Sequence, residues 1–256
     1  MLLLLAAILP AFVHAEIKTM DIDYKDGNVE LQGFLAYDDA KGASPQPGVL
    51  IVHEWWGHND YVRNRAKQVA GLGYVAFALD MFGKGVKTDD PKKAGELAGQ
   101  FYKDRNLMRS RAMAGLNVLK SQKNVDPNRL AAVGYCFGGS TALELARGGA
   151  PLAGVVSFHG GLDFPTADDN KNIKGKLLLC TGADDPMIPP EKVNAFESQL
   201  RDAKVNFQIN IYSGAVHAFT NPKADEHHIR GIAYNAQADR RSWYAMKGFF
   251  EEIFAK

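Results

Sequence analysis

The stretch that decides the fold of this 256-residue chain is Leu130–Ala142, which reads LAAVGYCFGGSTA. Its apolar first half predicts a buried strand, and the apolar spacing that follows predicts a helix that begins at once. A strand that turns this sharply into a helix needs glycines, because the turn leaves no room for Cβ atoms. The residue at the apex, here Cys136, therefore projects its side chain beyond the end of the sheet. It takes the place of the serine in a G-x-S-x-G nucleophile elbow.

The position of Cys136 allows two interpretations. The following helix directs its N–H groups and the positive end of its dipole at the sulfur, which favours a thiolate and a developing oxyanion. A free cysteine is, however, often a small residue of the hydrophobic core. The elbow pattern favours the first interpretation, a nucleophilic thiol.

The composition is that of an ordinary globular protein. Hydrophobic residues make up 46% of the chain and charged residues 23%, which is enough apolar material for a sizeable core. The 30 Lys and Arg residues nearly balance the 29 Asp and Glu residues, and the net charge is +1. This balance indicates neither a nucleic acid nor a membrane surface as a partner.

The first 15 residues predict a secretory signal peptide, although no Lys or Arg precedes the apolar run. Leu2–Leu9 is uninterrupted apolar sequence, and Val13-His14-Ala15 resembles a cleavage site before Glu16. The run is too short for a bilayer, which takes about 20 residues, so no stable membrane insertion is expected after cleavage. We expect an exported protein, periplasmic or secreted, with one domain over residues 16–256. If the start is mis-assigned, the protein is cytoplasmic.

Apolar runs and helical patterns alternate along the rest of the chain. An antiparallel hairpin with its turn at Asp26-Gly27-Asn28 is expected over residues 20–37. The other expected strands cover residues 49–53, 74–79, 130–135, 154–158, 176–181 and 206–212. The expected helices cover residues 61–72, 89–122 in two pieces, 142–147, 191–203 and 234–254. This alternation predicts an α/β fold, a mostly parallel central sheet flanked by helices on both faces.

Chemically useful side chains follow several of the expected strands. In such sheets, ligands bind beyond the carboxyl ends of the strands. A thiol nucleophile needs a base within hydrogen-bond reach, and the base needs a third group that fixes its tautomer. Cys136, Asp185 and His217 occur in the nucleophile–acid–base order of α/β-hydrolases. Asp184 is the rival for the acid, although the spacing from Gly182 favours Asp185.

Four motifs along the chain are similar to those of one known family. They are VHEWWG at 52–57, VGYCFGG at 133–139, GADDP at 182–186 and GAVHAF at 214–219. On these motifs, and over a span from about Met20 to Phe254, the sequence resembles the dienelactone hydrolase family of α/β-hydrolases. The resemblance implies the α/β-hydrolase fold and hydrolysis of a small-molecule ester or lactone, with no cofactor and no metal.

The resemblance also implies roles for individual residues. Cys136 is then the nucleophile, His217 the base and Asp185 its orienting partner. Glu54 contacts the resting thiol and helps to control formation of the thiolate. The two implied oxyanion-hole donors are the backbone N–H groups of Phe137 and Trp55.

One feature of the family is missing from this sequence. Dienelactone hydrolases carry an arginine soon after the catalytic histidine, where it holds the substrate carboxylate, whereas the run 217–222, HAFTNP, has no cation. Lys84 is the candidate for a replacement charge. We expect Trp56, Phe82 and Phe219 to line an aromatic substrate pocket together with Trp55.

Two histidine-containing stretches suggest metal sites, but neither fits one well. His53 and His58 are five residues apart and follow a strand, so they do not form the H-E-x-x-H motif of zinc proteases. Glu226-His227-His228 is better explained as a solvated surface. Similarly, His159-Gly160-Gly161 is expected to be a turn near the site, because the oxyanion loop of lipases precedes the elbow.

Three hypotheses follow from these patterns. The first is a cysteine-dependent ester or lactone hydrolase that acts through an acyl-thioester on Cys136. The second is a thiol-based redox or peroxide-responsive protein, in which Cys136 is oxidised or pairs with Cys180. The third is a binding protein that has only kept the fold, but such a protein has no need of Asp185 and His217. The substrate and the oligomeric state stay open.

Overall fold

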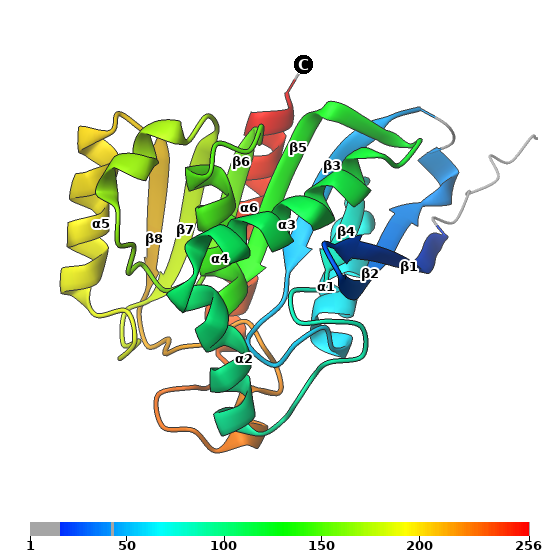
Figure 1. The fold of residues 1–256 in the computed structure, drawn as a ribbon. Helices are drawn as coiled ribbons and strands as arrows, with labels where there is room; N and C mark the ends of the chain where they lie inside the picture. The colour runs from blue at the N-terminus through cyan, green and yellow to red at the C-terminus, as the bar shows by residue number, and fades with distance from the viewer. Residues whose placement is uncertain (1–15, 42–43, 256) are drawn as a thin grey trace, which may run out of the picture.

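The computed structural model describes residues 16–41 and 44–255 of the chain (Figure 1). The signal peptide predicted over residues 1–15 lies outside the described residues. Within the described part, no helix is both long enough and apolar enough to cross a bilayer.

One eight-stranded sheet forms the centre of the fold, with the strand order β1-β2-β4-β3-β5-β6-β7-β8. The strands are β1 (Ile17–Asp26), β2 (Val29–Asp38), β3 (Gln46–Val52), β4 (Val75–Leu79), β5 (Val125–Tyr135), β6 (Gly154–Phe158), β7 (Lys176–Gly182) and β8 (Phe207–Tyr212). The β1–β2 hairpin is antiparallel and joins the sheet antiparallel to β4, whereas the pairs from β4 to β8 are all parallel. The predicted hairpin and mostly parallel sheet are confirmed.

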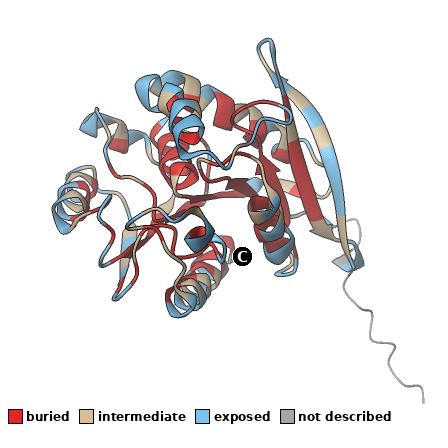
Figure 2. Cartoon of the chain, turned by 90° about the horizontal axis from the view of Figure 1, so that it is seen from below, coloured by how far each residue is buried: buried red, intermediate tan, exposed pale blue. Residues whose placement is uncertain are grey.

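Helices cover both faces of the sheet (Figure 1). They are α1 (Asp60–Ala70), α2 (Pro91–Lys103), α3 (Arg105–Lys120), α4 (Phe137–Arg147), α5 (Pro190–Asp202) and α6 (Ala236–Phe254). The apolar sides of α1 and α6 pack on one face, and those of α2, α3, α4 and α5 pack on the other. Figure 2 shows the result, a sheet whose central strands are buried between helices with exposed outer sides, while the edge strand β1 has no buried residue.

The amphipathic spacing of the helices explains this layering, because each helix buries one apolar stripe. In α1, for example, Val62, Ala66 and Val69 recur at helical spacing and are fully buried. The side chain of Asn59 caps this helix by accepting from the N–H of Tyr61. Since β4 to β8 are parallel to β3, their carboxyl ends share one edge of the sheet, and the candidate site lies there.

The turn from β5 into α4 has the strained geometry of a nucleophile elbow. Cys136 has φ 55° and ψ −119°, a conformation that non-glycine residues rarely adopt and that costs on the order of 1–3 kcal/mol. The turn is also crowded, because a Cβ on Gly134 would collide with the carbonyl group of Gly138. A Cβ on Gly138 would in turn collide with the carbonyl oxygen of Val52. The glycines of the motif are therefore required by close backbone approach.

We predict that Gly134→Ala lowers the free energy of unfolding by at least about 2 kcal/mol, because the added methyl group has no space at the elbow. Gly99→Ala is the matched control, since a Cβ there meets no atom within 4 Å and alanine favours the helix by about 1 kcal/mol. Denaturant unfolding of both variants tests this. Equal stability of the two variants would contradict the crowding described here.

Candidate active site

Cys136, His217 and Asp185 form a continuous hydrogen-bonded chain at the carboxyl edge of the sheet. Cys136 follows β5, Asp185 follows β7 and His217 follows β8. His217 Nε2 lies 3.0 Å from Cys136 Sγ, and His217 Nδ1 lies 2.8 Å from Asp185 Oδ2. The second carboxylate oxygen of Asp185 accepts from the N–H of Met187 at 2.8 Å, which fixes the carboxylate. The rival Asp184 is exposed, and the carboxylate that bonds His217 Nδ1 is that of Asp185.

The charges at this chain favour a proton on His217. Burial alone would lower the pKa of His217, but the Cys136 sulfur and the Asp185 carboxylate outweigh it and raise the pKa to about 10. His217 Nδ1–H then donates to Asp185, and Nε2–H donates to the sulfur. The N-terminal end of α4 points its dipole at the same sulfur. The geometry thus suits a thiolate–imidazolium pair.

Glu54 lies directly after β3 and is only 2% exposed. Its Oε2 accepts from the Asn221 side-chain amide at 2.6 Å. Burial raises the pKa of Glu54 to about 7, while the Asn221 hydrogen bond and the nearby His217 both lower it. The resemblance implied that Glu54 contacts the resting thiol. In this structure the Cys136 sulfur is instead hydrogen-bonded to His217, and the Glu54 carboxylate is held by Asn221.

The two N–H groups that the resemblance implied as oxyanion-hole donors belong to residues at the carboxyl edge of the sheet. Phe137 is the first residue of α4, and Trp55 follows β3. Both residues line the same cavity as Cys136. No hydrogen bond from either amide is found within residues 16–41 and 44–255. Both amides are therefore available to an acyl oxygen.

The backbone N–H of Cys136 is held by a histidine whose role the sequence analysis missed. It donates to His159 Nδ1 at 3.1 Å and to the carbonyl oxygen of Phe158 at 3.0 Å. Burial holds the pKa of His159 well below its usual value, so the ring is neutral. His159 Nε2–H then donates to Thr220 Oγ1 at 2.8 Å. The Tyr61 hydroxyl is hydrogen-bonded to the same Thr220 Oγ1 at 2.7 Å. Because His159 comes after the elbow, its sequence position gave no signal beyond a turn near the site.

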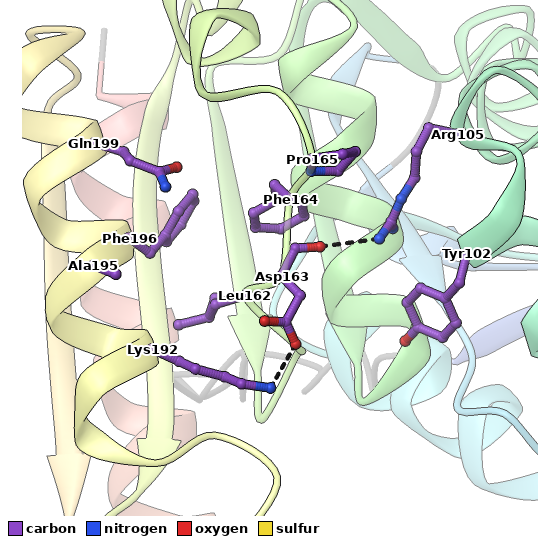
Figure 3. A pocket seen from close by; sticks show the side chains of 10 residues that line it. All are labelled: Tyr102, Arg105, Leu162, Asp163, Phe164, Pro165, Lys192, Ala195, Phe196 and Gln199. Carbon is purple, nitrogen blue, oxygen red and sulfur yellow. Dashed lines mark hydrogen bonds and ion pairs between the residues drawn. The ribbon is translucent and has the colours of Figure 1, made fainter.

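A cavity of about 600 Å³ opens above Cys136 and His217. Its lining is mainly apolar and includes Trp55, Ala98, Phe137, Pro186, Met187, Ile188 and Ile232. Four polar residues, Tyr102, Arg105, Asp163 and Lys192, lie between it and a second cavity of about 420 Å³. Figure 3 shows this polar group, in which Asp163 lies between Arg105 and Lys192. Lys192 Nζ is 2.6 Å from Asp163 Oδ2, and Arg105 donates to the Asp163 backbone oxygen at 3.0 Å.

Four side chains that we predicted to bind substrate lie outside the lining of this cavity, and the prediction is corrected. Trp56 is buried and stacks on His227 with the ring centroids 3.8 Å apart. Phe82 and Phe219 are buried core residues on opposite faces of the sheet. Lys84 is paired with Asp23 of the β1–β2 hairpin at 2.6 Å. Each of these side chains therefore packs against or pairs with residues outside the cavity.

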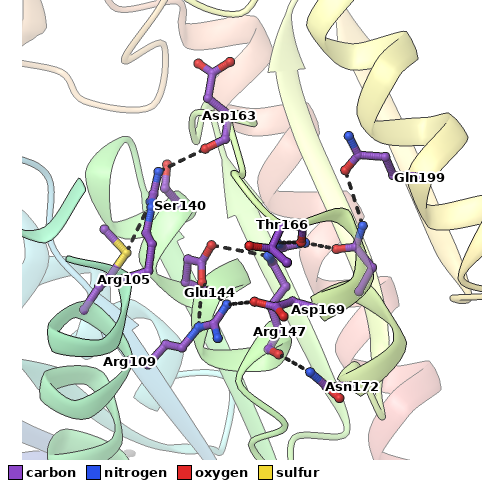
Figure 4. Close-up of polar contacts among 12 residues, drawn as sticks. Arg105, Arg109, Ser140, Glu144, Arg147, Asp163, Thr166, Asp169, Asn172 and Gln199 are labelled. Carbon is purple, nitrogen blue, oxygen red and sulfur yellow. Dashed lines mark hydrogen bonds and ion pairs between the residues drawn. The ribbon is translucent and has the colours of Figure 1, made fainter. Parts of the chain in front are cut away.

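A buried ionic network supports the wall of the cavity (Figure 4). Arg147, in α4, is fully buried and donates to Glu144, to the backbone oxygen of Thr166 and to Asn170. Arg109 donates to the carboxylates of Glu144, at 2.7 Å, and Asp169, at 2.5 Å. The network thus ties the segment after β6, which carries Asp163, to the helix that follows Cys136.

Neither cysteine is in a disulfide, so pairing of Cys136 with Cys180 is not seen. Cys180 is buried in β7 beside Tyr212, and burial raises the pKa of its thiol to about 12. Among the described residues, no group of three or more His, Cys, Asp or Glu side chains is arranged to hold a metal ion. In the predicted solvated surface at 226–228, Glu226 and His228 are exposed, whereas His227 is partly covered because it stacks on Trp56.

The fold and the site together define an α/β-hydrolase: a mostly parallel sheet with a nucleophile elbow after β5, and an acid and a base after β7 and β8. The sequence profile of the dienelactone hydrolase family matches residues 31–254. The chain therefore belongs to the dienelactone hydrolase family. The predicted family, fold and class of enzyme, an ester or lactone hydrolase, are confirmed.

Individual relatives agree with this assignment. The solved structure of a dienelactone hydrolase-like promiscuous phosphotriesterase from metagenomic libraries is 41% identical, with a TM-score of 0.91, and the match covers 94% of this chain and all of that one. A provisionally named carboxymethylenebutenolidase of Aquifex aeolicus is 25% identical over 234 residues, which cover 90% of this chain and 96% of the relative. A solved structure from Klebsiella pneumoniae, 20% identical with a TM-score of 0.77 over 92% of this chain and 98% of that one, shares the fold.

The raised pKa of Glu54 predicts a pH-dependent stability. Between the usual carboxyl pKa of about 4.5 and the folded value of about 7, the folded state holds a proton that the unfolded state has lost. The wild type therefore loses stability as the pH rises through this interval, whereas Glu54→Gln lacks this loss. Urea unfolding at pH 5 and pH 8 measures the difference, and the variant should gain stability relative to the wild type at pH 8. A pH-independent difference would contradict the assignment.

Proposed function

We propose that this protein is a cysteine-dependent hydrolase of carboxylic esters or lactones that acts through an acyl-thioester on Cys136. The proposal is carried by one observation, the chain Cys136–His217–Asp185 with contacts of 3.0 and 2.8 Å at the floor of a largely apolar cavity. A thiolate needs no further activation to attack a carbonyl carbon.

In the first half-reaction, the Cys136 sulfur bonds to the acyl carbon, and the carbonyl electron pair moves onto oxygen. The N–H groups of Phe137 and Trp55 stabilise that oxyanion, and loss of one such donor typically raises the barrier by about 3–4 kcal/mol. Collapse re-forms the carbonyl and breaks the ester C–O bond. The leaving oxygen takes the proton from His217 Nε2, and an acyl-thioester stays on Cys136. In a lactone the leaving hydroxyl stays attached to the acyl group.

In the second half-reaction, neutral His217 takes a proton from water as the water oxygen bonds to the acyl carbon. Collapse of this second oxyanion breaks the C–S bond and releases the acid. The thiolate–imidazolium pair is then restored. Asp185 supports both steps, because its hydrogen bond to Nδ1 keeps Nε2 directed at the reacting groups.

The redox hypothesis has less support at this site. A disulfide mechanism needs a resolving thiol, and Cys180 is buried beside Tyr212 with its pKa raised to about 12. Oxidation would then be confined to Cys136 itself, as a sulfenic acid. Such a reaction makes no use of Asp185 or of the two free oxyanion donors.

Two cations on the cavity wall suggest which substrates fit. Arg105 is held between the rings of Tyr102 and Phe164, with its guanidinium carbon 5.0 and 6.0 Å from their centroids. Lys192 approaches from α5, and Asp163 lies between the two. Two positive charges and one negative charge leave a net charge of +1 at this wall. We therefore propose that substrates with a carboxylate are accepted through Arg105 and Lys192, in place of the arginine missing after His217.

Phosphotriester hydrolysis is a second candidate activity. The 41% identical relative is named a promiscuous phosphotriesterase, and the apolar lining and the absence of a cation directly after His217 suit a neutral triester. In such a reaction the Cys136 thiolate would attack the phosphorus, and the N–H groups of Phe137 and Trp55 would stabilise the charge on the phosphoryl oxygen. A neutral triester therefore belongs in the panel of test substrates.

Replacement of the two cysteines tests the proposed function. Cys136→Ala should lower kcat/KM for p-nitrophenyl acetate by at least about a thousandfold, because the nucleophile is lost. Cys180→Ala is the matched control and should keep activity close to wild type, because this thiol lies in the core away from the cavity. Full activity of Cys136→Ala would refute the assignment. An inactive wild type with oxidised Cys136 would support the redox hypothesis instead.

Charge replacement tests the substrate class. Arg105→Gln and Lys192→Gln should each lower kcat/KM for an ester with a free acyl carboxylate by about tenfold, which corresponds to about 1.4 kcal/mol. A neutral ester of the same length should change by less than about twofold. Lys84→Gln, which removes a cation paired with Asp23, is the control and should affect neither ester. If only Lys84→Gln discriminates between the esters, the assignment of Arg105 and Lys192 is wrong.

A further inference from the structure

The imidazole of His53 is buried beside the site, is hydrogen-bonded at both ring nitrogens and takes no part in the acyl transfer. It lies directly after β3 and is fully buried. Its Nδ1 is 2.5 Å from the backbone oxygen of Glu54, and its Nε2 is 3.2 Å from the backbone nitrogen of Met81. Each ring nitrogen therefore has one partner.

These two partners determine the tautomer of His53. The backbone nitrogen of Met81 can only donate, so Nε2 must accept and carries no proton. The single proton of the neutral ring is then on Nδ1 and is donated to the oxygen of Glu54. A second proton on Nε2 would face the N–H of Met81, and burial lowers the pKa of His53 in agreement with a neutral ring.

The carbonyl group of Glu54 belongs to the same peptide as the N–H of Trp55. All described peptide bonds are trans, so this carbonyl and this N–H point in opposite directions. When His53 holds the Glu54 oxygen on the core side, the Trp55 N–H is directed away from the core, and Trp55 lines the cavity with Cys136. The Glu54 oxygen also accepts from the N–H of Gly57 at 3.2 Å, a longer contact.

The ring of His53 also packs beside the second oxyanion donor. Its centroid is 6.1 Å from that of Phe137, and it meets Phe82 edge to face at 4.8 Å. Phe137 carries the other implied donor N–H. His53 thus contacts both segments whose amides face the reacting carbonyl.

We propose that His53 is a positioning residue that fixes the Glu54–Trp55 peptide, so that the Trp55 N–H points at the developing oxyanion. The hydrogen bond from Nδ1 also polarises this peptide and makes its N–H a stronger donor. The inference rests on the proposed function, since it concerns the oxyanion hole of that reaction.

The turn that follows β4 has an anchor of its own, which keeps a variant of His53 testable. Asp80 Oδ1 accepts from the N–H groups of Phe82 and Gly83 at 2.9 and 3.0 Å, and Asp80 Oδ2 accepts from Gln32 at 3.2 Å. This turn does not depend on His53 alone. His53→Phe keeps a ring in the space and removes both hydrogen bonds, whereas His53→Asn keeps a donor near the position of Nδ1.

The test compares two reactions of the same thiol in the Cys180→Ala background, where Cys136 is the chain's only cysteine. Hydrolysis of p-nitrophenyl acetate passes through an oxyanion. Alkylation by iodoacetamide forms a C–S bond and releases iodide without any oxyanion, so it reports the thiolate alone. His53→Phe should lower kcat/KM for the ester by about a hundredfold, mostly in kcat, and change the alkylation rate by less than about twofold. His53→Asn should recover part of the ester activity.

Different outcomes would contradict the role of His53 and the proposed function. Equal losses of ester hydrolysis and alkylation in both variants, or no loss in either, would overturn the role of His53. His58→Phe is the matched control, because His58 also bonds a backbone oxygen, that of Ala78 at 3.1 Å, which belongs to neither of the peptides that carry the oxyanion donors. The same selective loss in this control would also overturn the inference. A parent protein without Cys136-dependent ester turnover would instead contradict the proposed function.

Discussion

The contact on which the site depends is the 3.0 Å approach of His217 Nε2 to Cys136 Sγ. A sulfur and an imidazole attract strongly only when both are held together away from water. The parallel sheet achieves this, because the segments after β5 and β8 end at the same edge although 81 residues separate the two side chains. The strained backbone of Cys136 places the sulfur above the sheet, and the crowded glycines permit that conformation.

Around this pair, two buried histidines hold backbone groups in place, and further charged side chains lie on the cavity wall. His159 holds the backbone of Cys136, and His53 holds the peptide of Trp55; both rings are buried. A buried neutral histidine has one donor and one acceptor, so it fixes two backbone groups without adding charge near the thiolate. The charges of Arg105, Asp163 and Lys192 lie instead on the cavity wall, where part of each side chain reaches solvent.

The sequence predicted the fold, and it predicted that Cys136, Asp185 and His217 lie at the same edge of the sheet, because both follow from local patterns. Each of Cys136, Asp185 and His217 follows a strand, and this can be read from the sequence. Because parallel strands end at the same edge of the sheet, the three side chains meet there. The predicted substrate residues, in contrast, lie outside the cavity lining. The loop that carries Lys84 turns toward Asp23 of the hairpin, a pairing between residues 61 positions apart that no local pattern reveals. Arg105 and Lys192 lie on one cavity wall because both contact Asp163, which belongs to a segment far from each of them in the sequence.

The most direct test of the account is to trap the acyl-enzyme. The protein would be mixed with a slowly hydrolysed activated ester, quenched in acid, digested and analysed by mass spectrometry. If Cys136 is the nucleophile, one acyl group is found on the peptide that contains Cys136. It is removable by hydroxylamine, as expected for a thioester, and absent after prior alkylation by iodoacetamide. An acyl group on another residue, such as Ser140, or ester turnover that persists after Cys136 is alkylated, would contradict it.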